Sequence, residues 1–251
     1  MSRTPTKADV TVVAKRAVEI LKNARLPCYL LGSMAAMLWG NSRTPNVCVS
    51  VIVSQDVIEF HKQDVDIVVL TTTYGAETVK RHIINSDARY HLVPSTNPHN
   101  KYKVLWYIDG SISCKVDILI PPTLNLPFLV ESRIVLKDDL PICPLLPLLL
   151  LKLQGWDNHC SAQWPNLRAK SRIDAADVNE LLAAAVRGDT KIADAQWLGP
   201  AFVEAGRRRS QSYIASYPAS RDAWAALGFT PAHQGLGILR IYEKKVTRED
   251  P

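Results

Sequence analysis

Two aspartates open the apolar segment Asp64-Val65-Asp66-Ile67-Val68-Val69-Leu70, and the fold class is best inferred from this segment. Its short length and its run of β-branched residues are typical of a buried strand, here one that opens with two carboxylates. Side chains alternate between the two faces of a strand, so Asp64 and Asp66 point to one face and the residues between and after them to the other. Two carboxylates this close repel each other and raise each other's pKa unless a cation holds them.

A third carboxylate lies on a later candidate strand, where Asp117 sits within Cys114-Lys115-Val116-Asp117-Ile118-Leu119-Ile120. If that strand neighbours the first, the three aspartates complete a Mg²⁺ site, because Mg²⁺ takes oxygen ligands and keeps water and phosphate as the rest. We therefore expect Asp64, Asp66 and Asp117 to converge on one face of the sheet. The alternative is that they are solvent-facing residues at the end of an edge strand.

Upstream, the apolar run Cys28–Leu31 ends at Gly32-Ser33, which predicts a turn from a strand into a helix. The sequence pattern predicts strands mixed with helices in the N-terminal half and mainly helices in the C-terminal half. The expected strands are 28–31, 64–70, 90–93, 103–108, 113–120 and 133–136, and the expected helices are 8–24, 33–39, 75–85, 145–156, 173–186, 197–213 and 220–227. This order predicts an α+β fold with residues 1–140 as the domain that carries the three aspartates and 141–251 as a mainly helical C-terminal region.

Composition is that of an ordinary soluble protein, with 47% hydrophobic and 22% charged residues in a chain of 251. The net charge of +6 and the pI near 9.1 are compatible with nucleotide or nucleic-acid binding without demanding it. Basic residues gather within residues 1–25 and at Arg207-Arg208-Arg209. Each cluster is either a solvated helix face or a surface that faces phosphate or RNA.

Three features predict a cytoplasmic protein without a membrane segment. The five cysteines are odd in number and lack C-x-x-C spacing, which points to a reducing compartment. The N-terminus carries no apolar signal region. The apolar run 145–151 is far shorter than the roughly 20 residues that span a bilayer, so a core helix is the better interpretation.

The ordered set Leu31-Gly32-Ser33, Asp64-Val65-Asp66 and Asp117 resembles the signature of the DNA polymerase β-like nucleotidyltransferase superfamily. Within that superfamily the sequence most resembles the nucleotidyltransferase component of abortive-infection toxin–antitoxin systems. Its further motifs are matched by Gly32-Ser33-Met34-Ala35-Ala36-Met37-Leu38-Trp39-Gly40-Asn41-Ser42-Arg43-Thr44, by Leu151-Lys152-Leu153 and by Arg172-Ile173-Asp174-Ala175-Ala176-Asp177. The resemblance covers roughly residues 25–185.

The resemblance implies a nucleotidyltransferase fold, with residues 1–140 as its catalytic domain. It also implies transfer of a nucleoside monophosphate from an NTP, such as ATP. This reaction would use two Mg²⁺ ions, which Mn²⁺ could replace. By the resemblance, Asp64 and Asp66 bridge both ions, and Asp117 holds the catalytic ion and helps to accept the proton of the acceptor hydroxyl. Gly32 and Ser33 contact the β- and γ-phosphates, and Lys152 neutralises charge on the triphosphate. Asp174 or Asp177 contacts the base, the ribose or Lys152. The non-functional alternatives are that Ser33 is only the N-cap of a helix, that Lys152 is an exposed lysine, and that Asp174 and Asp177 lie at a solvated helix start.

The resemblance leaves the acceptor open. The toxin-like branch implies the 3′ end of RNA or tRNA, whereas antibiotic-modifying relatives imply a small molecule. A third alternative is a catalytically silent protein that binds nucleotide or RNA. Retention of all three aspartates argues against it.

One departure from the family pattern is the distance between the turn and the first aspartate. Thirty residues separate Ser33 from Asp64, where about a dozen are usual, and removal of Val47–Gln63 restores a family-like spacing. The segment is either a natural hairpin or loop insertion, or a translated short intron, because Val codons begin with GT and one Gln codon ends with AG. We expect it to be dispensable and structurally poorly determined, although its alternating valines also suit an added edge strand or hairpin.

Overall fold

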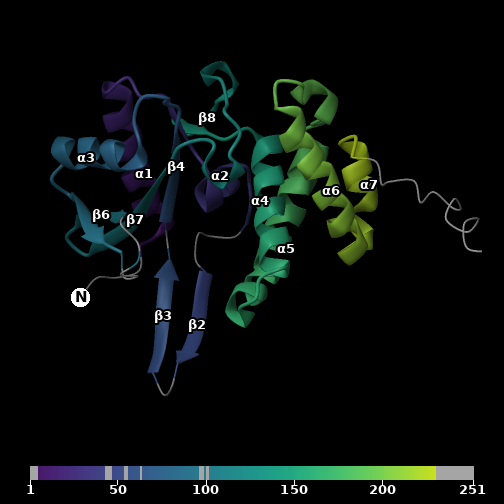
Figure 1. Cartoon of the computed structure of the whole chain (residues 1–251), viewed down its shortest axis with the longest axis horizontal. Coiled ribbons are helices and arrows are strands. Elements are labelled where there is room, and N and C mark those ends of the chain that lie inside the picture. Colours follow the sequence, from purple (N-terminus) through teal and green to yellow (C-terminus); the bar gives the residue numbers. More distant parts are fainter. Residues whose placement is uncertain are drawn as a thin grey trace, which may run out of the picture.

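The structure is a computed structural model that describes residues 5–42, 47–53, 56–62, 64–95, 99 and 102–229 (Figure 1). Its centre is a seven-stranded mixed sheet in the order β5-β6-β7-β4-β1-β9-β8. The strands of this sheet are β1 (Cys28–Leu30), β4 (Asp64–Val69), β5 (Tyr90–Pro94), β6 (Lys103–Asp109), β7 (Ile112–Leu119), β8 (Val135–Lys137) and β9 (Leu140–Ile142). The α+β fold expected from the sequence is confirmed.

The middle of the sheet brings distant parts of the sequence together. Strand β4 pairs in parallel with β7 and antiparallel with β1, and β1 pairs in parallel with β9. In β4 the residues Val65 and Ile67 are fully buried, whereas Asp64 and Asp66 are half-buried. The predicted alternation of the strand is therefore confirmed.

Helices cover the sheet and continue beyond it. They are α1 (Lys7–Asn23), α2 (Gly32–Leu38), α3 (Ala76–Ser86), α4 (Leu145–Cys160), α5 (Pro165–Arg187), α6 (Pro200–Ser216) and α7 (Arg221–Ala226). Helix α4 contacts α2, α5 and α6, so it joins the sheet side of the molecule to the C-terminal helices. The apolar run 145–151 lies in α4 and is largely buried, as predicted for a core helix. Within the part of the chain that the structure describes, no helix has the length and apolar character needed to cross a bilayer.

Strands β2 (Val47–Val53) and β3 (Asp56–Lys62) form a separate antiparallel hairpin. Among the described residues these two strands pair only with each other and add no strand to the seven-stranded sheet. Figure 1 shows the hairpin extending away from the end of β4. The hairpin is one of the two forms that the alternating valines suggested, and the other, an added edge strand of the main sheet, is not seen among the described residues. The expectation that the segment is dispensable and poorly determined stays a prediction. Residues 43–46, 54, 55 and 63 of the segment and its flanks lie outside the described residues.

Deletion of residues 47–63 is expected to leave the fold intact, because the main sheet takes no strand from them. Shortening the connection changes loop closure by less than about 1 kcal/mol. Solubility should stay the same or rise, since an unpaired apolar hairpin edge promotes aggregation. Thermal unfolding and metal-dependent nucleotide binding measure the outcome, with a variant carrying a short Gly-Ser linker as the control for strain at the junction.

Loss of cooperative unfolding in both variants would show that the hairpin is native structure on which the fold depends. The intron interpretation has an independent test in the genomic DNA. It requires GT at the start of codon 47 and AG at the end of codon 63.

Candidate metal and nucleotide site

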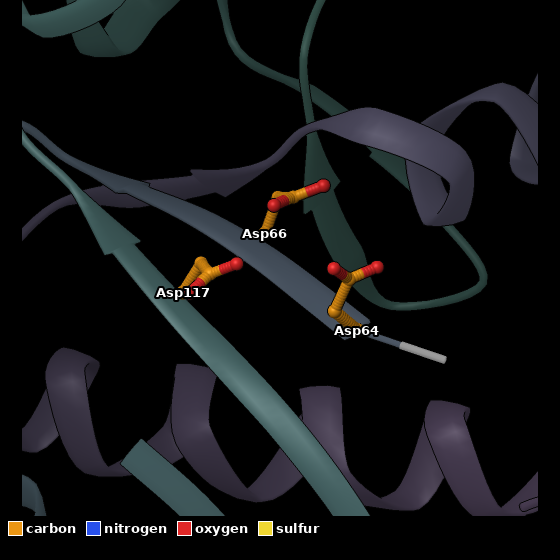
Figure 2. Close-up of side chains that lie close together, drawn as sticks. All are labelled: Asp64, Asp66 and Asp117. Carbon is orange, nitrogen blue, oxygen red and sulfur yellow. The ribbon is translucent and has the colours of Figure 1, made fainter. Parts of the chain in front are cut away.

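Three carboxylates converge where β4 and β7 run side by side. Asp66 is the direct neighbour of Asp117 in the parallel ladder, and Asp64 is the neighbour of Lys115. One carboxylate oxygen from each of Asp64, Asp66 and Asp117 lies within 4.8 Å of the others. Figure 2 shows the three side chains facing one another on the same side of the two strands. The expected convergence on one face is confirmed.

Asp66 is the central member of this carboxylate cluster. Burial raises its pKa from 3.8 to about 7, and the negative charges of Asp64 and Asp117 act in the same direction. The positive charges of Lys152 and Lys115 lower it in part. The raised pKa of Asp66 reflects burial and repulsion among the three carboxylates, and a bound cation would relieve this repulsion and favour the ionised form of Asp66.

Gly32 leaves the space that the Asp66 carboxylate occupies. A Cβ atom on Gly32 would lie 1.9 Å from Oδ2 of Asp66 and 2.9 Å from its Cγ. The backbone of Gly32 has φ +63°, which is in the left-handed region that favours glycine. The N–H of Leu31 donates to the carbonyl oxygen of Asp66 at 2.9 Å, so the turn is fixed against β4. Ser33 follows as the second residue of α2.

Lys115 belongs to the cluster, and the sequence patterns did not single it out. Its Nζ donates a hydrogen bond to Oδ2 of Asp117 and lies 4.0 Å from Oδ2 of Asp64. Lys115 stands two residues before Asp117, hence on the same face of β7. That spacing was the available signal, but it gains meaning only from the pairing of β7 with β4.

Lys152, on α4, lies near enough to Asp66 for its positive charge to lower the pKa of that carboxyl group. Its Nζ donates to Oδ2 of Asp177 on α5 at 2.8 Å, and the Asp177 side chain is 1% exposed. Asn41 donates from Nδ2 to Oδ1 of the same aspartate at 3.4 Å. Asp177 thus ties α5 both to Lys152 and to the residues that follow α2.

The neighbouring residue Ser42 extends this link. Its backbone N–H and its hydroxyl donate to the Glu180 carboxylate at 2.5 and 2.6 Å. Arg43 and Thr44, the last residues of the family-like stretch, lie outside the described residues.

Asp174 is not brought to Lys152. Its Oδ2 lies 2.5 Å from Nδ1 of His159, about two helical turns beyond Lys152 along α4. Of the two aspartates in the predicted pair, the structure therefore places only Asp177 against the lysine.

The arginine cluster on α6 has protein partners. Arg207 donates to the carbonyl oxygen of Gly228 at 3.0 Å and lies over the ring of Phe229. Arg209 pairs with Asp157 at 3.5 Å. These contacts favour a structural role over a surface that faces RNA.

No protein-family model matches the chain, and no curated protein matches its sequence. Among solved structures, an antigenic nucleotidyltransferase-like protein from Paracoccidioides brasiliensis matches with a TM-score of 0.58 at 11% identity, over 90% of this chain and 95% of that one. The antibiotic-resistance factor ANT(2'')-Ia matches with a TM-score of 0.43 at 10% identity, over 87% and 99% of the two chains. Terminal uridylyl transferase 4 from Trypanosoma brucei matches with a TM-score of 0.30 at 12% identity, over 79% and 53%.

The first of these matches spans nearly the whole of both chains and shows that this chain has the nucleotidyltransferase fold. At 11% identity it establishes the fold alone. The similarity to the abortive-infection branch stays a prediction. Activity has to be argued from the carboxylate cluster and its surroundings.

Proposed function

We propose that this protein is a metal-dependent nucleotidyltransferase that moves a nucleoside monophosphate from an NTP to an acceptor hydroxyl. One observation carries the proposal: on a nucleotidyltransferase fold, two parallel strands place three carboxylates within 4.8 Å of one another. An arrangement of this kind is costly for a protein unless the charge is used, because like charges destabilise one another.

The residues present fit a hard divalent cation. Asp64, Asp66 and Asp117 offer only carboxylate oxygens, the ligands that Mg²⁺ and Mn²⁺ prefer. Gly32 keeps the space of the Asp66 carboxylate open. Two Mg²⁺ ions are proposed in line with the family resemblance. Bound divalent cations supply charge stabilisation for the attacking and leaving oxygens in sites of this class.

The remaining roles follow from where each group lies. The N–H groups of the Gly32-Ser33 turn, at the start of α2, are proposed to bind the β- and γ-phosphates. Lys152, on the α4 side of the cluster, is proposed to neutralise triphosphate charge, with Asp177 fixing its orientation. Asp117 is the proposed acceptor of the proton that leaves the attacking hydroxyl. No role in nucleotide binding is proposed for Asp174, whose partner is His159.

We expect Lys152→Ala to weaken NTP binding by about tenfold or more, because it removes a charge worth roughly 1.5–3 kcal/mol in a hydrogen bond to phosphate. The variant also leaves the buried Asp177 charge without its lysine, which costs about 3 kcal/mol of folding free energy. A double variant, Lys152→Met with Asp177→Leu, separates the two effects.

Replacement of a buried ion pair by apolar residues is often neutral for stability. The double variant should therefore recover most of the melting temperature while NTP binding stays weak. Nucleotide titration by calorimetry, together with thermal unfolding, measures both quantities. Wild-type NTP affinity in the double variant would leave the ion pair with a structural role only.

The activity is tested by incubating the protein with each α-labelled NTP, Mg²⁺ and total RNA, and by following which molecule becomes labelled. Label at RNA 3′ ends is the expected result, with the net charge of +6 in support. Label on small hydroxyl compounds in an RNA-free extract would instead identify the antibiotic-type reaction. Metal-dependent NTP binding without any transfer would identify a silent nucleotide-binding protein.

A further inference from the structure

Lys115 occupies the place between two of the three carboxylates. Its Nζ is hydrogen-bonded to Asp117 and lies 4.0 Å from Oδ2 of Asp64. The two carboxylates stand on different strands, and Lys115 is the ladder partner of Asp64. The ammonium group therefore bridges β4 and β7 at the position where a divalent cation would draw the same oxygens together.

The local charges keep this lysine protonated. Burial acts to lower the pKa of Lys115, but the hydrogen bond that its Nζ donates to Asp117 and the negative charges of Asp117, Asp64 and Asp66 outweigh this effect, and the pKa is raised. The side chain is 24% exposed, so its flexible four-carbon stem has a direction in which to leave. Lys115 is therefore a positive charge inside an anionic cluster, on a side chain that reaches solvent.

We propose that Lys115 is the resident counter-ion of the metal cluster, holding Asp64 and Asp117 together in the metal-free protein and giving them up when divalent cations bind. This inference rests on the proposed function, because it takes the carboxylates to be metal ligands. Lys115 is thereby a positioning residue. It preserves the arrangement of the ligands without metal and competes with metal for two of them.

Competition follows from the geometry. A cation coordinated by the same Asp117 oxygen would stand within a few ångströms of the ammonium nitrogen, and two positive charges at that distance repel strongly in a partly buried site. Either the lysine moves away or the metal binds more weakly. In the first case part of the binding free energy of the metal is used to displace Lys115, and in the second the repulsion lowers the metal affinity directly.

The test uses the full chain without nucleotide and measures Mn²⁺ and Mg²⁺ binding by calorimetry. For Lys115→Met we expect metal binding to be about tenfold tighter than in the wild type. The metal-free variant should melt lower than the wild type, because the carboxylates lose their counter-ion, and metal should raise its melting temperature by more. Lys115→Arg keeps the charge and should bind metal as the wild type does.

Lys103→Met provides the matched control. Lys103 lies on the adjacent strand β6, on the face of Leu105, whose ladder partner Val116 points away from the aspartates. This change should leave metal affinity unaltered. Should Lys115→Met fold poorly, Lys115→Gln keeps a polar side chain without the charge and is measured in its place.

Equal or weaker metal binding in the neutral Lys115 variants would overturn the counter-ion role while the proposed function stands. Failure of the wild-type protein to bind divalent cations, with or without NTP, would instead overturn the proposed function and this inference with it. Tighter binding in both Lys115→Met and Lys103→Met would also overturn it, because the effect would then reflect net charge.

Discussion

The substitution Asp66→Asn is expected to lower nucleotidyl transfer by on the order of a thousandfold or more, because it removes the central anionic ligand of the cluster. The amide has almost the same shape as the carboxyl group, so packing around Gly32 should persist. Loss of activity should therefore occur without loss of the fold. The rate of transfer from the preferred α-labelled NTP, at saturating Mg²⁺, measures the effect.

The same variant should be more stable than the wild type when metal is absent. The pKa of Asp66 is about 7 in the folded protein against an ordinary value of 3.8, so the folded state holds the proton more tightly than the unfolded state. The stability that this proton confers is fully present below about pH 4 and is lost as the pH rises through 7. Asp66→Asn has no carboxyl group to titrate at this position. At pH 8 in EDTA its free energy of unfolding should therefore exceed that of the wild type by on the order of 2 kcal/mol.

Thermal unfolding from pH 5 to 8, with EDTA and with Mg²⁺, checks the stability prediction. The wild type should lose melting temperature toward pH 8 in EDTA and regain it with Mg²⁺, while the variant should respond weakly to both. Asp222→Asn, at an exposed position of α7, is the matched control. Full transfer activity in Asp66→Asn would remove this residue from the catalytic centre.

The sequence predicted those parts of the site that depend on local pattern. The alternation in 64–70 placed Asp64 and Asp66 on one face, and a single further assumption, that the strand of Asp117 is adjacent, produced the cluster. The helical spacing likewise predicted the helices of the C-terminal half. In these cases a residue's environment follows from its near neighbours in the sequence.

Other parts depended on contacts that no local pattern encodes. Lys115 looks like an ordinary surface lysine until the ladder register sets it opposite Asp64. Asp174 and Asp177 lie one turn apart and are equivalent by sequence pattern. In the structure Asp174 contacts His159 of α4, whereas Asp177 contacts Lys152 of the same helix. Helix α5 also begins at Pro165, eight residues before the expected start, because its polar first turns give little apolar periodicity.

The parallel pairing of β9 with β1 is another contact that no local sequence pattern encodes. Strand β9 is three residues long, Leu140–Ile142, and contains a proline, so neither length nor composition predicts a strand. Its place in the sheet comes from packing, since Leu140 and Ile142 are fully buried. Short strands of this kind are fixed by tertiary contacts.

The second large effect is expected at Gly32, where the site depends on an absent side chain. The substitution Gly32→Ala places a Cβ 1.9 Å from Oδ2 and 2.9 Å from Cγ of Asp66, so the carboxylate has to turn out of the cluster. The left-handed backbone adds about 1–2 kcal/mol of strain for an alanine. We expect metal affinity to fall by up to about a hundredfold, with transfer activity falling at least as far.

Gly40→Ala separates strain from displacement of the carboxylate. Gly40 also has a positive φ, +93°, but nothing lies within 4 Å of a Cβ atom at that position. Both alanine variants should therefore lose some melting temperature, while only Gly32→Ala should lose affinity for Mn²⁺. Equal metal affinity in the two variants would mean that Asp66 can ligate a cation from another rotamer. A large loss at Gly32 alone would show that this glycine sets the position of the central metal ligand.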